Sequence, residues 1–216
     1  MNEIILGDCI KVMAGMADKS FDLCYADPPF NARKGIGKNS REYANGLETK
    51  TDEEYKKFCL DWFAQARRVA KKLVVTPGVR ALWNYPPALW VVEINKPSSV
   101  SYSAVGGFNC YEPFVFYDGP IKGKRIPRDV VVFDAQNFIK DGRHSHPCPD
   151  NGNMCLWIID LFLHRGGAVL VPFSGSGQME IAAQKMGCNY LGIDIVPEYV
   201  ELARHRLRMD KEQKRI

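Results

Sequence analysis

The sequence feature that most constrains the fold is the segment 168–195, which reads AVLVPFSGSGQMEIAAQKMGCNYLGIDI. It predicts a buried strand over 168–172, a turn with two glycines, a helix through Met186 and a second strand over 190–195. Two strands joined by a crossover helix lie parallel in one sheet. The segment therefore predicts an α/β protein with a parallel sheet.

The rest of the chain repeats this alternation of strand and helix. Apolar runs predict further strands over 3–6, 21–26, 73–76, 89–94 and 113–117. Helices are predicted over 9–16, 51–72, 154–164 and 197–209, and Thr51 to Glu54 form a capping-box pattern at the start of the second. We expect a mostly parallel sheet with helices on both faces, and the 216 residues fit one domain.

Composition limits the classes of protein to which the chain can belong. The formal net charge of +4 permits nucleic-acid binding without requiring it. Seven cysteines without a Cys-x-x-Cys pair indicate a reduced, intracellular protein rather than a disulfide scaffold. No segment approaches the roughly 18 apolar residues of a membrane helix. We therefore expect a cytoplasmic protein with no membrane partner.

A zinc site is an alternative function for the histidines and cysteines in the second half of the chain. The candidate ligands are His144, His146, Cys148, Cys155 and His164. Because their spacing fits no standard zinc finger, we expect no metal.

The turn and the acid within 168–195 indicate a site for a nucleoside cofactor. Gly175 and Gly177 let the backbone approach a ligand closely, and the helix after them presents free N–H groups. Asp194 ends the next strand, where it can accept hydrogen bonds from two ribose hydroxyls. The structural alternative is an ordinary glycine turn followed by a strand-ending acid.

The segment YADPPFN, at 25–31, is the second candidate site. Asp27 ends an apolar strand, and Pro28 and Pro29 are stiff residues without an N–H donor. Phe30 adds an aromatic ring. The structural alternative is a strand that stops at a Pro-Pro turn, with the ring in the core.

The two candidate sites and three other segments resemble one known family in the same order along the chain. The family is that of β-class S-adenosylmethionine-dependent DNA amino-methyltransferases. The resembling segments are ILGDCIKVMAGMADKSFDLCYADPPFN, INKPSS with FNCYEPFVFY, HSHPCPDN, PFSGSG and YLGIDIVPEYVELARHRL. The resemblance implies a circularly permuted Rossmann-like methyltransferase fold with a seven-stranded sheet. It also implies S-adenosyl-L-methionine as the cofactor and DNA as a partner.

The resemblance also assigns roles to individual residues. Asp27, Pro28, Pro29 and Phe30 would be catalytic, and Asp27 would also border the cofactor. Asp8 and Cys9 would flank the cofactor adenine, while His146 and Pro147 would lie near its methionine end. The remaining cofactor-binding residues would be Pro172, Phe173, Ser174, Gly175, Ser176, Gly177, Asp194 and Ile195.

The expected reaction is methylation of the exocyclic N6 amine of adenine in DNA. Such an amine carries two N–H donors, so a site that activates it should offer acceptors and no competing donors. The ionised Asp27 carboxylate and the Pro28 carbonyl meet this need, and Phe30 can stack on a flipped base. Methylation of the N4 amine of cytosine is the alternative reaction.

A catalytically weak, nucleic-acid-binding subunit is the alternative from another class. Its support is that the chain departs from the family pattern at Val171 and at Asp150-Asn151. The Asp-Pro-Pro-Phe motif itself is intact.

Two basic segments are candidates for contacts with DNA phosphates. The first contains Arg33, Lys34, Lys38 and Arg41, and the second contains Lys122, Lys124, Arg125 and Arg128. For each segment, a solvated loop without DNA contacts is an equally supported alternative. We divide the single domain 1–216 into a catalytic half (1–117), a minimal recognition region (118–145) and a cofactor-binding half (146–216). Because the recognition region is small, we expect short or loose sequence specificity, or recognition by a homodimer mate or a partner protein.

Overall fold

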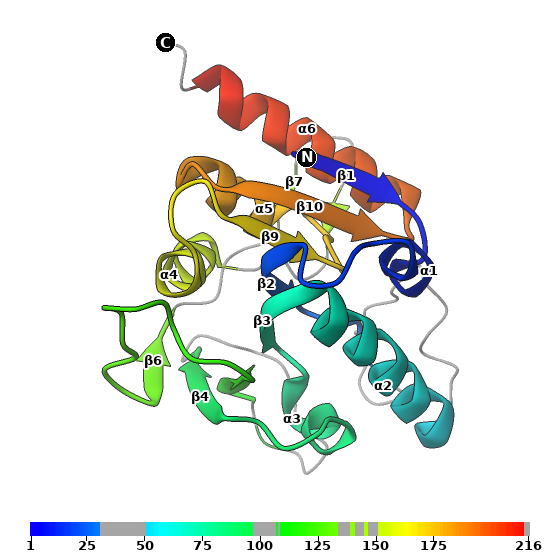
Figure 1. The fold of residues 1–216 in the computed structure, drawn as a ribbon, viewed down its shortest axis with the longest axis vertical. Coiled ribbons are helices and arrows are strands. Elements are labelled where there is room, and N and C mark those ends of the chain that lie inside the picture. The colour runs from blue at the N-terminus through cyan, green and yellow to red at the C-terminus, as the bar shows by residue number, and fades with distance from the viewer. Residues whose placement is uncertain are drawn as a thin grey trace.

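The computed structural model describes residues 1–30, 51–96, 107, 109–133, 139–140, 145–146 and 151–213. Within these residues, eight strands form one sheet in the order β1-β10-β9-β2-β3-β5-β4-β6 (Figure 1). Their bounds are β1 (Glu3–Leu6), β2 (Phe21–Ala26), β3 (Ala70–Val75), β4 (Trp90–Asn95), β5 (Tyr111–Phe116), β6 (Val130–Val132), β9 (Ala168–Val171) and β10 (Asn189–Asp194). Two short strands, β7 (Ile139–Lys140) and β8 (Ser145–His146), pair separately.

The sheet is mostly parallel, as the sequence predicts. β1, β10, β9, β2 and β3 are parallel neighbours, β5 is antiparallel to β3 and β4, and β6 is parallel to β4. The expected count of seven strands is wrong, because Val130–Val132 adds an eighth beside Glu93–Asn95. Three residues carry no readable period, so only the pairing with β4 makes this segment a strand. The circular permutation stays a prediction.

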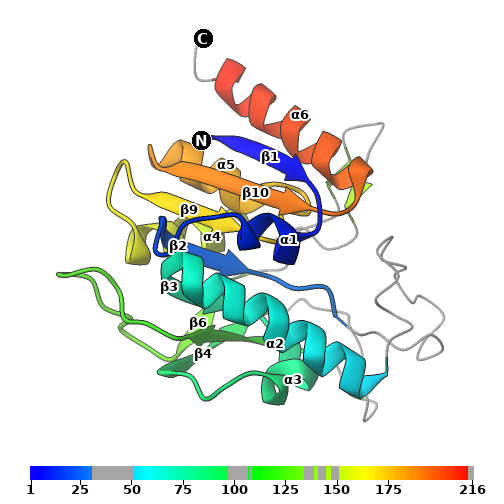
Figure 2. The ribbon, with the colours of Figure 1, turned by 45° about the vertical axis from the view of Figure 1, so that its right-hand side comes forward.

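Helices cover both faces of the sheet, which confirms the predicted fold class (Figure 2). One buried cluster joins the sheet to α1 (Cys9–Ala14), α2 (Asp52–Val69) and α3 (Gly78–Ala81), which the 3-10 helix η2 (Leu82–Asn84) follows. The other cluster joins it to α4 (Gly152–Phe162), α5 (Gln178–Lys185) and α6 (Pro197–Gln213). Strand residues alternate between the clusters, as in a sheet buried on both faces. No helix of the described ranges is long and apolar enough to cross a membrane.

Helix α2 begins as the sequence predicts and ends earlier. The Thr51 side chain accepts from the Glu54 amide, and the Glu54 side chain accepts from the Thr51 amide, so the capping box is confirmed. The helix stops at Val69 rather than Lys72 because Ala70 and Lys72 pair with β2. Pairing along a sheet here overrides local helix propensity.

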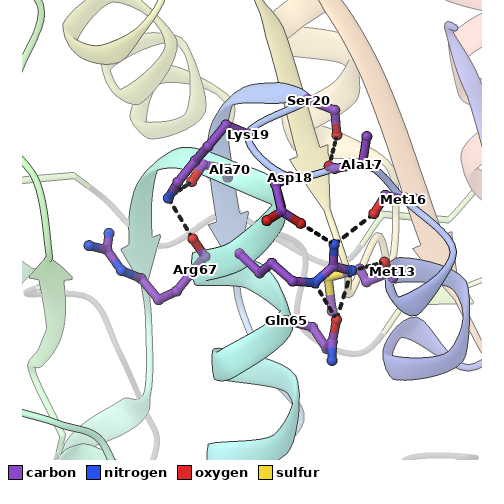
Figure 3. Close-up of polar contacts among 10 residues, drawn as sticks. Met13, Met16, Ala17, Asp18, Lys19, Ser20, Gln65, Arg67 and Ala70 are labelled. Atoms are coloured by element: carbon purple, nitrogen blue, oxygen red, sulfur yellow. Dashed lines mark hydrogen bonds and ion pairs between the residues drawn. The ribbon is translucent and has the colours of Figure 1, made fainter.

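The end of α2 is fastened to the last turn of α1 and to the connection that leads from α1 into β2 (Figure 3). The Arg68 guanidinium donates to the carbonyls of Met13 (2.6 Å) and Met16 (2.7 Å) and pairs with Asp18 (2.7 Å). The Lys19 ammonium donates to the carbonyls of Arg67 (2.7 Å) and Ala70 (2.8 Å). These contacts hold the end of α2 beside β2, the strand that Asp27 follows.

Candidate active site

The two candidate sites lie side by side because β2 and β9 are paired neighbours. Leu23 and Cys24 of β2 pair with Val169 and Leu170 of β9. Along the chain, β2 is followed by β3 on one side of this pair, and β9 by β10 on the other. The strand order therefore reverses between β2 and β9, and ligands of α/β sheets bind at the carboxyl ends of such a pair. Asp27 follows one strand there, and the PFSGSG loop follows the other.

The Asp27 carboxylate is held by the end of the neighbouring strand. The Thr76 amide donates to the Ala26 carbonyl at 2.9 Å, which continues the β2–β3 ladder. The Thr76 hydroxyl then donates to Oδ1 of Asp27 at 2.5 Å. Thr76 is only 1% exposed, so this charge-assisted bond is shielded from water. The sequence analysis did not identify Thr76 as a site residue. Its position as a polar residue at the end of an apolar strand could have indicated that it lies beside the site.

The residues after Asp27 are fixed by contacts with α2 and α3. The Tyr55 hydroxyl, on α2, donates to the Pro29 carbonyl at 2.9 Å. The Phe30 ring lies on Gly78, where a Cβ atom would come within 2.6 Å of its Cε1 atom. Gly78 also has a φ of +67°, so both space and backbone favour glycine here. Pro28 is buried and Phe30 is half-buried.

The glycine turn is tied to the acid that ends β10. The Gly175 amide donates to Oδ2 of Asp194 at 2.8 Å, and the Val196 amide donates to Oδ1 at 2.9 Å. Burial raises the pKa of Asp194 above its ordinary value, although these amides and that of Ile195 oppose the shift. The two bonds fix the plane of the carboxylate, and each of its oxygens has a second lone pair for a ligand hydroxyl.

A buried acid on α5 also supports the glycine turn. Glu180 has no exposed surface, and its Oε1 atom accepts from the Ser174 hydroxyl at 2.5 Å. The Ser174 amide donates to the Ile193 carbonyl at 2.9 Å. A Cβ atom on Gly192 would come within 2.3 Å of Oε1, so this glycine makes room for the acid. The sequence analysis treated Glu180 only as a residue of the helix.

The second half of the turn packs against α6. Gly177 has a φ of +74°, and a Cβ atom on it would come within 2.8 Å of the Ala203 Cβ atom. Ser176 is buried, and its carbonyl accepts from Arg206 at 2.5 Å. Glycine thus permits both the turn and the close approach of the two helices.

The aromatic residue of the loop, Phe173, is seated on α2. Its ring meets the Trp62 ring nearly edge to face, with centroids 5.3 Å apart and an interplanar angle of 85°. It also lies 6.1 Å from the Phe58 ring. Pro172 before it is buried and Phe173 itself is half-buried. The loop is therefore positioned by the helix that also contacts Pro29.

Asp8 and Cys9 lie near Asp194, because β1 pairs with β10. Leu6 pairs with Asp194, and the Gly7 amide donates to the Asp194 carbonyl at 2.9 Å. Oδ1 of Asp8 accepts from the Ile10 amide at 2.9 Å as the N-cap of α1. Burial, with the charges of Asp8 and Asp194, raises the pKa of Cys9 to about 12. This thiol is thus neutral at pH 7 and not a nucleophile.

The structure does not bring the second basic segment to the candidate active site. The Lys72 ammonium donates to the Gly119 carbonyl at 2.5 Å, near the beginning of β3, and Lys124 pairs with Asp160 of α4 at 2.6 Å. The segment then leads to β6, which three strands separate from β2. In Figure 2 the loop before β6 extends from the side opposite the carboxyl ends of β2 and β9. Lys122, Arg125 and Arg128 are exposed.

For the other predicted site residues, the structure describes the exposure or the backbone pairing, or does not describe the residue. Ile195 is exposed, and the backbone of His146 pairs with Ile139 in the β7–β8 ribbon. Pro147 and the first basic segment, Arg33, Lys34, Lys38 and Arg41, lie outside the described residues, as do the zinc candidates His144 and Cys148. In the described part of the chain, no three His, Cys, Asp or Glu residues are grouped so that they could hold a metal ion.

Comparison with known proteins places the chain in a family. The model of the N6/N4 methyltransferase family, described as DNA methylase, matches residues 95–205, just over half of the chain. The chain belongs to the N6/N4 DNA methylase family. Among similar proteins, the type II methyltransferase M2.MboI of Moraxella bovis is 26% identical over 235 residues, which cover 94% of this chain and 86% of the relative. The DNA adenine methyltransferase YhdJ of Escherichia coli (strain K12) is 23% identical over 247 residues, which cover 94% and 82%.

Two solved structures share the fold of this DNA methylase. The PvuII DNA methyltransferase, which is cytosine-N4-specific, superposes with a TM-score of 0.71 at 14% identity, over 97% of this chain and 89% of the other. The complex of M1.HpyAVI with SAM superposes with a TM-score of 0.65 at 16% identity, over 95% and 98%. The expected Rossmann-like methyltransferase fold is thereby confirmed.

Proposed function

We propose that this DNA methylase transfers a methyl group from S-adenosyl-L-methionine to the N6 amine of adenine in DNA. The observation that carries the proposal is the pairing of β2 with β9. It sets the Asp27 motif beside the PFSGSG turn at the carboxyl edge of the sheet. One motif supplies hydrogen-bond acceptors for an amine, and the other supplies a nucleoside site.

The residues beside the turn fit the proposed cofactor. The Asp194 carboxylate is held by two amides and suits two ribose hydroxyls. Gly175, with a φ of +51°, brings the backbone to the ligand, and the first amides of α5 point toward the same turn. Asp8 and Cys9 would border the adenine ring. When bound, S-adenosyl-L-methionine supplies an electrophilic methyl group on a sulfonium.

The role of Asp27 and Pro28 is to orient the target amine. A carboxylate and a proline carbonyl accept hydrogen bonds and offer no donor that would compete for the nitrogen lone pair. Two acceptors in tetrahedral directions favour a pyramidal amine, whose lone pair then points away from them. Catalysis comes mainly from this positioning and from acceptors that are already in place. The Phe30 ring provides a surface for a base flipped out of the duplex.

The N4 amine of cytosine is the second candidate target. An adenine N6 amine and a cytosine N4 amine offer the same two N–H donors, so Asp27 and Pro28 suit both. The similarity to YhdJ supports adenine. The likeness to the PvuII enzyme is a likeness of fold, which leaves the choice of base to the experiment.

The test is methyl transfer from labelled S-adenosyl-L-methionine to duplex DNA, followed by identification of the modified base. We expect N6-methyladenine from the wild type and none from Asp27→Ala. The matched control is Asp61→Ala, which removes a carboxylate from an exposed surface pair with Lys57 and should keep full activity. N4-methylcytosine would replace the adenine proposal with its alternative. DNA binding without transfer would favour the non-catalytic subunit, and transfer by Asp27→Ala would overturn the mechanism.

A further inference from the structure

We propose that Tyr55 is a positioning residue for methyl transfer, and that α2 aligns the two halves of the active site through it. The inference rests on the proposed function. It goes further in assigning a role to a helix that contributes no residue to either motif. Three side chains on one face of α2 connect the two motifs. Tyr55 contacts Pro29 of the Asp27 motif. Phe58 and Trp62 contact Phe173 of the cofactor loop.

The first contact fixes the backbone that carries the Pro28 carbonyl. Proline rings lock φ at Pro28 and Pro29, so the direction of each carbonyl depends on ψ alone. The Tyr55 hydroxyl donates to the Pro29 carbonyl at 2.9 Å, which sets ψ of Pro29. Tyr55 is only 3% exposed, so water competes little for this bond.

The other end of the same segment is fixed by β3. Thr76 donates to Oδ1 of Asp27 at 2.5 Å. Pro28 therefore lies between two residues that are each anchored by a buried hydroxyl. These two anchors can hold the direction of the Pro28 carbonyl during the reaction without themselves occupying its lone pairs. An acceptor in place before the reaction needs no reorganisation when the methyl group is transferred.

The second contact is with the cofactor loop. Phe58 and Trp62 follow Tyr55 by three and seven residues, so the three side chains lie on one face of the helix. The Phe173 ring lies 6.1 Å from Phe58 and 5.3 Å from Trp62, and the rings of Tyr55 and Phe58 are themselves 6.1 Å apart. A continuous row of rings thus runs from the catalytic segment to the cofactor loop.

The helix is anchored at both ends, as a positioning element must be. The capping box of Thr51 and Glu54 fixes its first turn, directly before Tyr55. Arg68 fixes its last turn to the end of α1 and to the connection that leads into β2. Because an α-helix is stiff over this length, a displacement of one motif is transmitted to the other.

The test compares Tyr55→Phe with the wild type in single-turnover methylation at saturating DNA and cofactor. The substitution removes only the hydroxyl, so we expect the rate to fall about five- to tenfold, in line with the loss of one hydrogen bond. The affinity for S-adenosyl-L-methionine, measured by calorimetry, should stay within about twofold, because the rings that seat Phe173 are kept. The complementary variant Phe58→Leu should weaken cofactor affinity more than it lowers the single-turnover rate.

The matched control is Tyr117→Phe. The Tyr117 hydroxyl also donates to a proline carbonyl, that of Pro86, at 3.0 Å, and it lies outside the active site. This variant should methylate at the wild-type rate. Thermal unfolding of all three variants separates a loss of rate from a loss of folded protein.

An unchanged rate for Tyr55→Phe in an active wild-type background would overturn the inference and leave the proposed function standing. Equal losses in Tyr55→Phe and Tyr117→Phe would also overturn it, since the effect would then be structural. Absence of methylation by the wild type would instead reject the proposed function.

Discussion

The Thr76 hydroxyl, at the end of β3, donates a 2.5 Å hydrogen bond to the Asp27 carboxylate, at the end of β2. Forty-nine positions separate the two residues along the chain, and only the parallel pairing of the two strands brings them together. The bond restricts rotation of the carboxylate, which in the proposed reaction accepts from the target amine in one direction. A strand-end threonine thus becomes part of the candidate active site.

Replacement of Thr76 by valine tests this relationship. Thr76→Val keeps the β-branched shape and removes the hydroxyl, so we expect methylation to slow by about tenfold, the effect of one buried charge-assisted hydrogen bond. Thr76→Ser restores the donor and should recover most of the rate. If Thr76→Val and Thr76→Ser were equally impaired, packing rather than the hydrogen bond would be responsible.

The pH dependence of cofactor binding follows from Asp194. In the proposed cofactor site, only the ionised carboxylate offers every lone pair to the amides and the ribose hydroxyls, so affinity should be present above the pKa and be lost as the pH falls through it. Burial raises the pKa of Asp194. We therefore expect the affinity for S-adenosyl-L-methionine, measured by calorimetry, to begin falling at a higher pH than an exposed aspartate would give. The Asp194→Asn variant should bind the cofactor weakly, and its affinity should fall less as the pH is lowered. If the affinity of this variant fell at low pH as it does in the wild type, another group would be responsible for the titration.

Gly177 and Gly166 provide a matched pair for backbone strain and close packing. Gly166 has a φ of +85° and open space around it, whereas a Cβ atom on Gly177 would meet Ala203 at 2.8 Å. We expect Gly166→Ala to lower the free energy of unfolding by about 1 kcal/mol, the usual effect of a left-handed backbone. Gly177→Ala should lower it by about 1–3 kcal/mol more, because α5 and α6 must separate. Urea unfolding measures both, and equal losses would show that the helices adjust freely.

The position of the second basic segment predicts that it contributes little to DNA binding in methylation. We expect the combined replacement of Lys122, Arg125 and Arg128 by alanine to leave the KM for DNA and its salt dependence unchanged. Lys124 is kept because of its ion pair with Asp160. Each cation that contacts a phosphate adds about one to the slope of log K against log salt, so a flatter slope in the variant would return this segment to the DNA interface.

Much of the fold could be predicted from local pattern. The bounds of β2 agree with the apolar run at 21–26, because a buried strand is a short continuous apolar run. The bounds of β1 also agree with the run at 3–6, although β1 is an edge strand whose buried residue is Ile4. The sequence-based predictions are wrong where pairing with a distant strand decides the secondary structure. Ala70 and Lys72 continue a helical pattern and yet join β2, and Val130–Val132 becomes a strand only beside β4.

The sequence by itself determined the α/β class, the two motifs and the chemistry that they can support, because residue type and spacing along one segment carry that information. Only the tertiary structure decided which residues support the motifs. Thr76, Tyr55 and Glu180 reach Asp27, Pro29 and Ser174 through hydrogen bonds set by strand order and helix docking. Strand order and helix docking depend on the burial of many side chains at once, so no short stretch of sequence encodes these partners.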